Sequence, residues 1–403
     1  MEAYFIDWFS VIVRWLHLIT GIAWIGASLH FVWLDNSLEE PDDDAKEKGI
    51  KGDLWAIHGG GVYHFSKYQL APPRWPSNLH WSKWEAYTTW MTGTLLMVAV
   101  YYLQAQSYLV GVDKWVADPT VAVIASIGYL LSGMLVYEAL VRSPLRFSPG
   151  IFVVLLGLFV CLQCWLATQL FSDRAAFLHV GALMGTIMAG NVFLGIIPAQ
   201  KKFVAAVQAG EAPDPAPAAF AKLRSTHNNY FTLPVLFCMI SNHYPFLYGH
   251  EFNYLVLISI IAITAYARHF FNLKHRGEVR YGVLIRAALA FLVLAGWLGF
   301  ERYEQQASMM ALQVDDSAAF ALIDQHCTVC HAASPTQPGF TAPPAGILMD
   351  DRDAVYRSAS QMLTAVSTDY MPLGNLTGIT PEERADLMAW LSKQSSTQQP
   401  AGQ

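Results

Sequence analysis

The stretch GIFVVLLGLFVCLQCWLATQLF, residues 150–171, decides the fold. It has no charged side chain, and its length is close to the ~20 residues that a helix needs to cross the hydrocarbon core of a bilayer. The composition of the 403-residue chain agrees, since 54% of its residues are hydrophobic and only 14% are charged. A soluble domain has about 25% charged residues. We therefore expect a protein that spans a membrane.

Seven other apolar stretches have a comparable length, which predicts a bundle of eight transmembrane helices. The eight expected helices cover residues 5–34, 84–108, 120–141, 150–171, 176–198, 230–248, 253–272 and 281–300. The sixth is the weakest, because the polar pair Asn242-His243 and then Pro245 interrupt its end. The first has no basic residues before it, so we expect no cleavable signal peptide there.

The connections between these helices alternate in their content of lysine and arginine. The rich connections are 35–83, 142–149, 199–229 and the turn after the seventh helix, and the poor ones are 109–119, 172–175 and 249–252. Rich connections face the cytoplasm. We therefore expect a multi-pass protein in the lipid bilayer of a bacterial inner membrane, with both termini on the periplasmic side.

The C-terminal part contains the haem-attachment motif Cys327-Thr328-Val329-Cys330-His331. In such a motif the two thiols add to the haem vinyl groups, and the imidazole of His331 binds the iron. Met371, in the loop YMPLGN at 370–375, is the expected opposite axial ligand, which raises the haem potential. Three rival methionines, none in a comparable Met-Pro loop, are Met349, Met362 and Met388. A zinc site would need further Cys or His ligands.

Helix signals flank this motif. An amphipathic helix is expected over 317–325, and Thr380 with Glu383 forms a capping box that opens a second helix. We expect His326 to be an incidental surface residue and the Pro/Ala-rich segment 209–219 to be a flexible loop. The prediction is an all-α chain in four parts. These are an eight-helix transmembrane domain (1–300), a linker (301–314), a small class I-like α-helical cytochrome c domain (315–394) and a flexible tail (395–403).

The formal net charge of -6 lies entirely in the C-terminal part. From Asp315 onward there are ten acidic and four basic residues, a difference of six, so the preceding residues sum to zero. No dense basic stripe exists, which argues against a nucleic-acid partner. An acidic cytochrome suits a basic electron acceptor, either a soluble cytochrome or a terminal oxidase.

Three histidines lie inside or at the ends of expected spans. His17 is in the first, His179 begins the fifth and His243 ends the sixth. An ionisable side chain in a membrane is costly and is therefore a functional candidate. His17 with His179 or His243 opposite could bind a haem b. In a haem-free membrane domain, which we favour, His17 serves the substrate pocket or packing.

The whole chain resembles the membrane-bound urate oxidases (urate hydroxylases), which carry a C-terminal cytochrome c domain. The resemblance rests on RWLHLITGIAWIGASLHFVWLDNS (14–37), GGGVYHFSKYQLAP (59–72), GTIMAGNVFLGIIPAQ (185–200) and RSTHNNYFTLPVLFCMISNHYP (224–245), together with the haem motifs. It implies two-electron oxidation of urate to 5-hydroxyisourate in purine catabolism. It also implies that electrons leave through the cytochrome, so that dioxygen need not be reduced to peroxide.

Urate is a flat, polar monoanion, so its site should offer aromatic faces, polar donors and a base. The expected cytoplasmic side supplies five candidate catalytic residues, namely His58, His64, His80, Glu85 and Asn229. A histidine is the most suitable base near neutral pH, and the sequence leaves open which one acts.

Two other classes of function remain open from sequence. One is a non-catalytic membrane anchor whose cytochrome carries electrons for another dehydrogenase. The other is a purine transporter with a redox domain, which would favour internal repeats and broken helices at the bilayer midplane.

Overall fold

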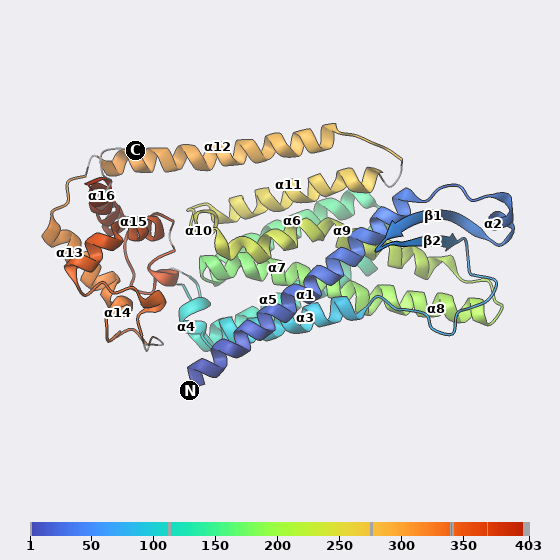
Figure 1. Cartoon of the computed structure of the whole chain (residues 1–403), viewed down its shortest axis with the longest axis horizontal. Helices are drawn as coiled ribbons and strands as arrows, with labels where there is room; N and C mark the ends of the chain where they lie inside the picture. Colours follow the sequence, from blue (N-terminus) through green and yellow to red (C-terminus); the bar gives the residue numbers. More distant parts are fainter. Residues whose placement is uncertain are drawn as a thin grey trace. The chain divides into compact units, whose positions relative to one another are not determined.

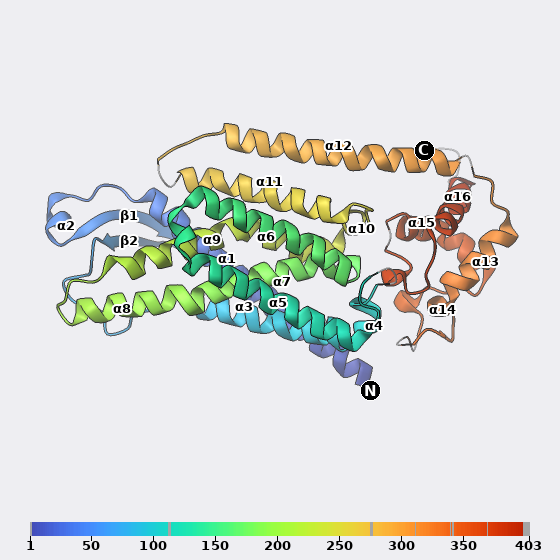
Figure 2. The same cartoon turned by 180° about the vertical axis from the view of Figure 1, so that it is seen from behind.

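The fold is almost entirely helical in the part of the chain that the structure describes (Figures 1 and 2). This part of the computed structural model covers residues 2–111, 114–274, 277–310, 312–338, 340, 342–368 and 370–397. The expected tail therefore lies outside the described residues from position 398 onward.

The elements of the first 310 residues follow one another in this order: α1 (Glu2–Ser37), α2 (Asp43–Glu47), β1 (Ile50–His58), β2 (Gly61–Tyr68), α3 (Trp84–Leu96), η1 (Met97–Tyr102), α4 (Ala105–Tyr108), α5 (Pro119–Arg142), η2 (Pro144–Phe147), α6 (Pro149–Leu170), α7 (Asp173–Asn191), η3 (Val192–Ile196), α8 (Ile197–Gln208), α9 (Pro215–Ile240), η4 (Ser241–His243), α10 (Pro245–Tyr248), α11 (Asn253–Lys274) and α12 (Gly282–Met310). The remaining elements are α13 (Asp316–His326), α14 (Thr328–His331), η5 (Pro344–Gly346), α15 (Arg352–Ser367), η6 (Leu373–Asn375) and α16 (Pro381–Thr397).

Six helices of the described residues are long and apolar enough to cross a membrane, which is compatible with a multi-pass membrane protein. They are Trp8–Ser37, Pro119–Arg142, Pro149–Leu170, Asp173–Gln208, Asn253–Lys274 and Gly282–Glu304.

The expected spans 84–108 and 230–248 are not among these six. The first changes into the π-helical η1 after Leu96, and the second ends at Ile240 before η4 and α10. The number of eight spans therefore stays a prediction. The expectation of a loop over 209–219 is wrong for its second half, since α9 already begins at Pro215.

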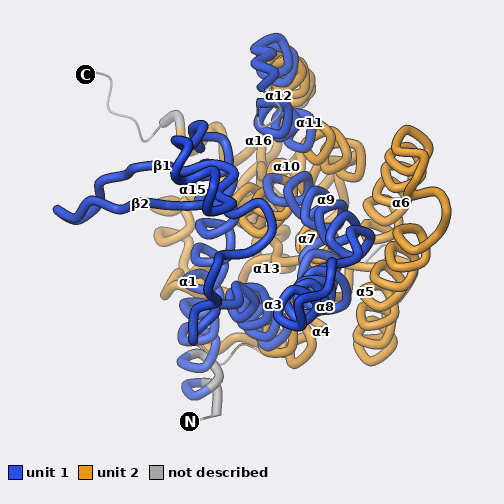
Figure 3. Tube along the Cα trace, turned by 90° about the vertical axis from the view of Figure 1, so that its right-hand side faces the viewer, with its two compact units in different colours: residues 1–96, 184–233, 264–287 blue, residues 97–183, 234–263, 288–403 orange. Residues whose placement is uncertain are grey.

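The chain forms two compact units, drawn in blue and orange in Figure 3. Unit 1 contains residues 1–96, 184–233 and 264–287, and unit 2 contains residues 97–183, 234–263 and 288–403. In unit 1, α1 packs along α3, and Ala86, Val192 and Ile197 form a buried apolar cluster.

A β-hairpin in unit 1 departs from the all-α prediction. β1 and β2 pair antiparallel up to His58 opposite Gly61. Gly59 and Gly60 between them have φ angles of 58° and 81°. Two-residue hairpin turns require this left-handed backbone, and glycine adopts it without strain. The glycine run was thus the sequence signal for the hairpin.

In unit 2, α5 and α6 lie side by side (Figure 2). Glycines allow close packing of α7 against two other helices. A Cβ atom on Gly133 of α5 would lie 2.4 Å from Cδ1 of Leu183 on α7. A Cβ on Gly181 of α7 would lie 2.5 Å from Cβ of Cys238 on α9. Glycines therefore let α7 approach both neighbours, as is common between helices in membranes.

The C-terminal helices of unit 2 share a hydrophobic core. Ile323 of α13 and Leu387 and Trp390 of α16 are buried in it, and the rings of Phe320 and Trp390 meet edge to face with centroids 5.4 Å apart. The expected capping box is confirmed: the Glu383 amide donates to Thr380 Oγ1 at 3.2 Å, and the Thr380 amide donates to Glu383 Oε2 at 2.8 Å.

Replacing Thr380 by alanine should lower the free energy of unfolding of the C-terminal domain by about 1 kcal/mol, because one amide of the first turn of α16 loses its acceptor. Denaturant-dependent limited proteolysis of the full chain measures this loss. Thr364→Ala is the matched control, since Thr364 is exposed within α15. Equal losses of unfolding free energy in the two variants would contradict a stabilising role of the Thr380 cap.

Candidate functional site

The residues of the haem-attachment motif line one cavity in unit 2. Cys327, Cys330 and His331 come from the short α14 and the residue before it, and Met371 comes from the loop between α15 and η6. The cavity brings all four together although Met371 is distant in sequence. Most of the other lining side chains are apolar.

A backbone carbonyl orients the imidazole of His331. Its Nδ1 lies 3.1 Å from the carbonyl oxygen of Ile347, to which an Nδ1–H group donates. This tautomer leaves Nε2 as the nitrogen that can bind a metal, which is how protein surroundings prepare histidine ligands. The ring is buried, so its position is well constrained.

The two cysteines are half-buried free thiols and do not form a disulfide. Burial raises the pKa of Cys327 to about 12, and it also raises the pKa of Cys330. A zinc site needs thiolates, which these raised pKa values disfavour. Among the described residues, no group of three or more Cys, His, Asp or Glu could hold a metal ion on its own.

Two thiols, an imidazole and a thioether around an apolar cavity therefore fit a covalently attached haem. His326 also lines this cavity, and the expectation that it is a surface residue is wrong. It is buried at the end of α13, where Nδ1 lies 2.9 Å from Oγ1 of Thr377 and Nε2 lies 3.6 Å from Oε2 of Glu383. The reason is tertiary: the end of α13 packs toward the start of α16.

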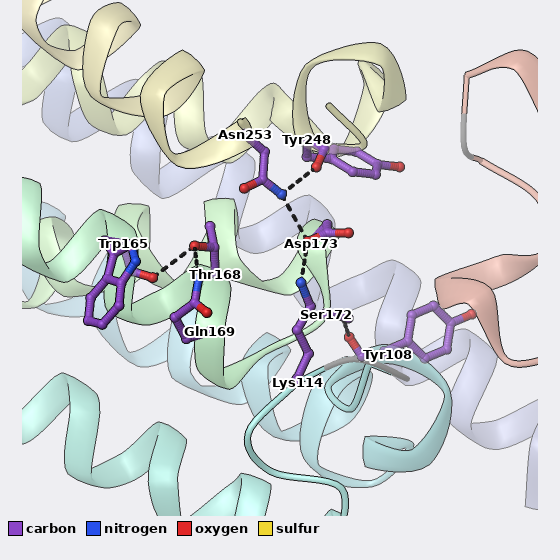
Figure 4. Close-up of polar contacts among 9 residues, drawn as sticks. All are labelled: Tyr108, Lys114, Trp165, Thr168, Gln169, Ser172, Asp173, Tyr248 and Asn253. Atoms are coloured by element: carbon purple, nitrogen blue, oxygen red, sulfur yellow. Dashed lines mark hydrogen bonds and ion pairs between the residues drawn. The ribbon is translucent and has the colours of Figure 1, made fainter. Parts of the chain in front are cut away.

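A polar network holds the helix ends beside this cavity (Figure 4). Asp173, which opens α7, accepts from Nζ of Lys114 at 2.7 Å and from Nδ2 of Asn253 at 2.9 Å. Ser172 donates to the carbonyl of Tyr108 at 2.7 Å. Next to this network, the guanidinium of Arg174 lies 5.5 Å from the ring centre of Tyr108, and both residues line the cavity. The network thus fixes one wall of the cavity.

The four candidate catalytic residues in and after the hairpin do not form one cluster in unit 1. His58 ends β1 and is exposed. His64 lies 3.1 Å from Asp53 and stacks on Trp55 with ring centroids 4.3 Å apart. Both contacts of the His64 side chain therefore lie within the hairpin.

His80 and Glu85 do come together, with Nε2 and Oε1 3.8 Å apart. His80 is exposed, whereas Oε2 of Glu85 is buried and has no hydrogen-bond partner. This pair combines a solvent-accessible imidazole with a partly buried carboxylate.

Asn229, the fifth candidate, belongs to a polar cluster of unit 1 that sequence reasoning did not assemble. Its Oδ1 accepts from Nη2 of Arg268 at 2.7 Å, and the hydroxyl of the adjacent Tyr230 lies 2.6 Å from Nδ1 of His269. The sequence signal for this cluster was an arginine inside an expected span, since Arg268 lies within 253–272.

The three intramembrane histidines make contacts within their own units. In unit 1, Nδ1 of His17 lies 3.0 Å from the carbonyl of Thr89. In unit 2, both ring nitrogens of His179 are engaged, by Ser126 and by the carbonyl of Ala175, each at 2.7 Å. His243 lies in η4 and is exposed. An iron ligand needs one available ring nitrogen, so His179 would have to give up a hydrogen bond. The haem b stays a prediction.

A family model described as urate oxidase N-terminal matches residues 3–299 of the chain. A search of curated proteins and a search of solved structures gave no match. The matched range ends within α12, before the helices that carry the cavity with Cys327 and Cys330. The family relationship is therefore carried by the membrane helices and the hairpin.

Proposed function

The chain belongs to the urate oxidase N-terminal family, and we propose that it is a membrane-bound urate oxidase that delivers electrons to a haem c in its own C-terminal domain. Urate and one water become 5-hydroxyisourate, while two electrons and two protons leave. Water supplies the oxygen of the new hydroxyl group, so dioxygen need not enter the reaction.

The observation that carries this proposal is the family match over residues 3–299 in a chain that continues into the cavity of Cys327, Cys330, His331 and Met371. A haem bound there would supply one-electron redox chemistry between the membrane domain and an external acceptor. Cys327 and Cys330 would hold it through two thioether bonds, and His331 and Met371 would be its axial ligands.

We place the protein in a bacterial inner membrane with eight spans, adding 84–108 and 230–248 to the six continuous apolar helices. The break in 84–108 is the π-helical η1, and the break in 230–248 is η4 over Ser241–His243. Neither break contains Asp, Glu, Lys or Arg. The alternation of basic connections supports periplasmic termini and a periplasmic cytochrome c domain over residues 315–394, joined by a linker over 301–314.

The external acceptor should be basic, either a soluble cytochrome or a terminal oxidase. The whole net charge of -6 lies in the residues from Asp315 onward. Hydrogen bonds from the Ala318 amide and from Trp390 hold the pKa values of Asp315 and Asp316 below their usual range, so both carboxylates stay charged at neutral pH. Such a surface attracts cations over a Debye length of about 8 Å at physiological ionic strength.

Urate should reduce the haem of the purified full-length protein in the absence of oxygen. The expected result is a rise of the reduced c-type absorption bands with two equivalents of electrons per urate consumed, and no hydrogen peroxide when oxygen is admitted. Allantoin, which has already lost the purine ring system, is the negative control.

Stoichiometric peroxide with an unreduced haem would contradict the proposed electron route, while urate would remain the substrate. Urate uptake into vesicles without oxidation would identify a transporter. A haem that is reduced only when a separate dehydrogenase is present would identify an electron-carrying anchor.

Both termini should be periplasmic. An alkaline phosphatase fused to the C-terminus should be active, and one inserted within residues 211–214, between α8 and α9, should be inactive. This enzyme folds only where disulfides form. The opposite pattern of activities would refute the proposed orientation.

A further inference from the structure

We propose that Arg268, Asn229 and Asn272, on the facing sides of α9 and α11 in unit 1, form the binding site for the urate anion. This assignment rests on the proposed function, because it identifies the residues of the membrane domain that would bind the substrate of that reaction. The ligand class is a planar, monoanionic oxopurine.

Arg268 is a buried cation in the middle of this cluster. It lies in a helix apolar enough to cross a membrane, and its exposed fraction is 3%. Its Nη2 donates to Oδ1 of Asn229 at 2.7 Å, while its Nε is buried and has no acceptor among the residues that the structure describes. The ion pairs among the described residues involve other side chains. A buried charge that lacks an anionic partner is strongly unfavourable, so an anion is expected beside it.

Asn272 adds a second donor that has no acceptor. It follows Arg268 by four positions on α11, so the two side chains share one face of the helix. Its Nδ2 is buried and has no hydrogen-bond partner in the described part of the chain. Oδ1 of Asn229 already accepts from Arg268, which leaves the Nδ2 group of Asn229 as a further donor. Three side chains thus offer N–H groups to a ligand.

A second polar layer positions Asn229 and adds positive charge. The fully buried Arg224 donates from Nη1 to Oδ1 of Asn191 at 3.1 Å. Asn191 donates to Oδ1 of Asn228 at 2.8 Å, and Asn228 donates to the carbonyl of Met188 at 3.0 Å. These bonds fix α9 at the residue directly before Asn229. Two buried arginines in one unit raise the electrostatic potential felt by an anion.

Flat rings lie on the same two helices, since Tyr230 follows Asn229 on α9, and Tyr266 and His269 are neighbours of Arg268 along α11. The rings of Tyr230 and His269 have centroids 6.0 Å apart and an interplanar angle of 24°, and those of Tyr266 and His269 are 6.4 Å apart at 20°. Near-parallel rings suit stacking on a planar heterocycle. The imidazole of His269, the residue after Arg268, is held through its Nδ1 by the hydroxyl of Tyr230 at 2.6 Å.

The chemistry of urate matches these groups. Urate is flat, carries one negative charge at neutral pH and presents carbonyl oxygens at its edges. The planar guanidinium of Arg268 can meet two such acceptors at once, which a lysine ammonium cannot do in the same geometry. A neutral purine would leave the buried charge unbalanced, so the site selects an anion.

The test compares Arg268→Gln and Arg268→Lys with Arg74→Gln in the full-length protein. Arg74 is an exposed arginine in the connection between β2 and α3 of the same unit, so it is a control for loss of one positive charge. We measure KM and kcat for urate and the change in melting temperature that saturating urate produces in detergent solution.

Arg268→Gln should raise KM at least about 30-fold, as expected for loss of charge-assisted hydrogen bonds, and should abolish the urate-induced rise in melting temperature. The melting temperature without urate should not fall, because the substitution removes an unbalanced buried charge. Arg268→Lys should recover only part of the affinity. Asn272→Leu, which removes a different unpartnered donor, should also raise KM.

Unchanged urate KM and unchanged urate-induced stabilisation in Arg268→Gln would overturn this binding site and leave the proposed function intact. The same holds if Arg74→Gln raised KM equally. A wild-type protein that neither binds nor oxidises urate would overturn both proposals. A fall in melting temperature of Arg268→Gln together with an unchanged KM would identify a merely structural arginine.

Discussion

Replacing Cys330 by alanine should remove most of the covalently bound haem from the protein. Cys330 and Cys327 line the same cavity as His331, so both thiols are placed to add across the vinyl double bonds of one haem. With one thiol missing, one of two thioether bonds is lost and attachment becomes inefficient. A denaturing gel stained for haem peroxidase activity should show a strong band for the wild type and a weak or absent band for the variant.

Cys161→Ala is the matched control for this experiment. Cys161 is a free thiol of α6 and does not line the cavity. Its replacement should leave the stained band unchanged. A wild-type protein without a band, produced in a host that attaches c-type haem, would refute haem binding altogether.

Met371→Ala gives a different outcome at the same cavity. The variant should keep its covalent haem, because both thiols remain, but the reduction potential should fall when the thioether ligand is lost. A reduction potential equal to that of the wild type would indicate that another methionine is the ligand. Met349 and Met362 also line the cavity.

Trp390→Ala should destabilise the C-terminal domain by about 3–5 kcal/mol, the range for removing a large buried aromatic side chain. Trp390 is 2% exposed, packs edge to face on Phe320, and donates from Nε1 to Oδ1 of Asp316 at 2.8 Å. A loss of this size is comparable to the whole stability of a small domain. Denaturant-dependent limited proteolysis of the full chain should therefore detect an open domain at low denaturant.

Trp390→Phe separates packing from hydrogen bonding. Phenylalanine keeps the ring contact with Phe320 but leaves Asp316 without this donor, so a loss of about 1–2 kcal/mol is expected. Equal proteolysis of Trp390→Ala and wild type would show that α16 does not hold the domain together.

The features that sequence predicted correctly depend on local signals. The capping box of Thr380 and Glu383 spans one helical turn, so its two hydrogen bonds follow from residue types three positions apart. The apolar stretch 150–171 likewise needs no partner to be recognised, and the structure places a helix over Pro149–Leu170. The glycines at 59 and 60 were also a local signal, since their left-handed backbone forms the hairpin turn.

The candidate site depended on contacts that no local pattern contains. His64 looked like a possible base in sequence, but the hairpin pairs it with Asp53 and Trp55. His326 looked incidental, but packing against the start of α16 buries it. In each case the partner is supplied by another element, so the side chain's surroundings could not be derived from its own helix or strand.

The sequence by itself determined that the chain is largely helical, that several of its helices are apolar enough for a membrane, and that a C-x-x-C-H motif lies outside them. Length, hydropathy and short spacings are properties of the chain, and they persist whatever the helices pack against. Only the tertiary structure decided that Met371 joins His331 at one cavity and that Arg268 meets Asn229 across 39 positions of sequence. The physical reason is that burial and the absence of a charged partner are set by neighbouring helices, and helix packing is not encoded in any single segment.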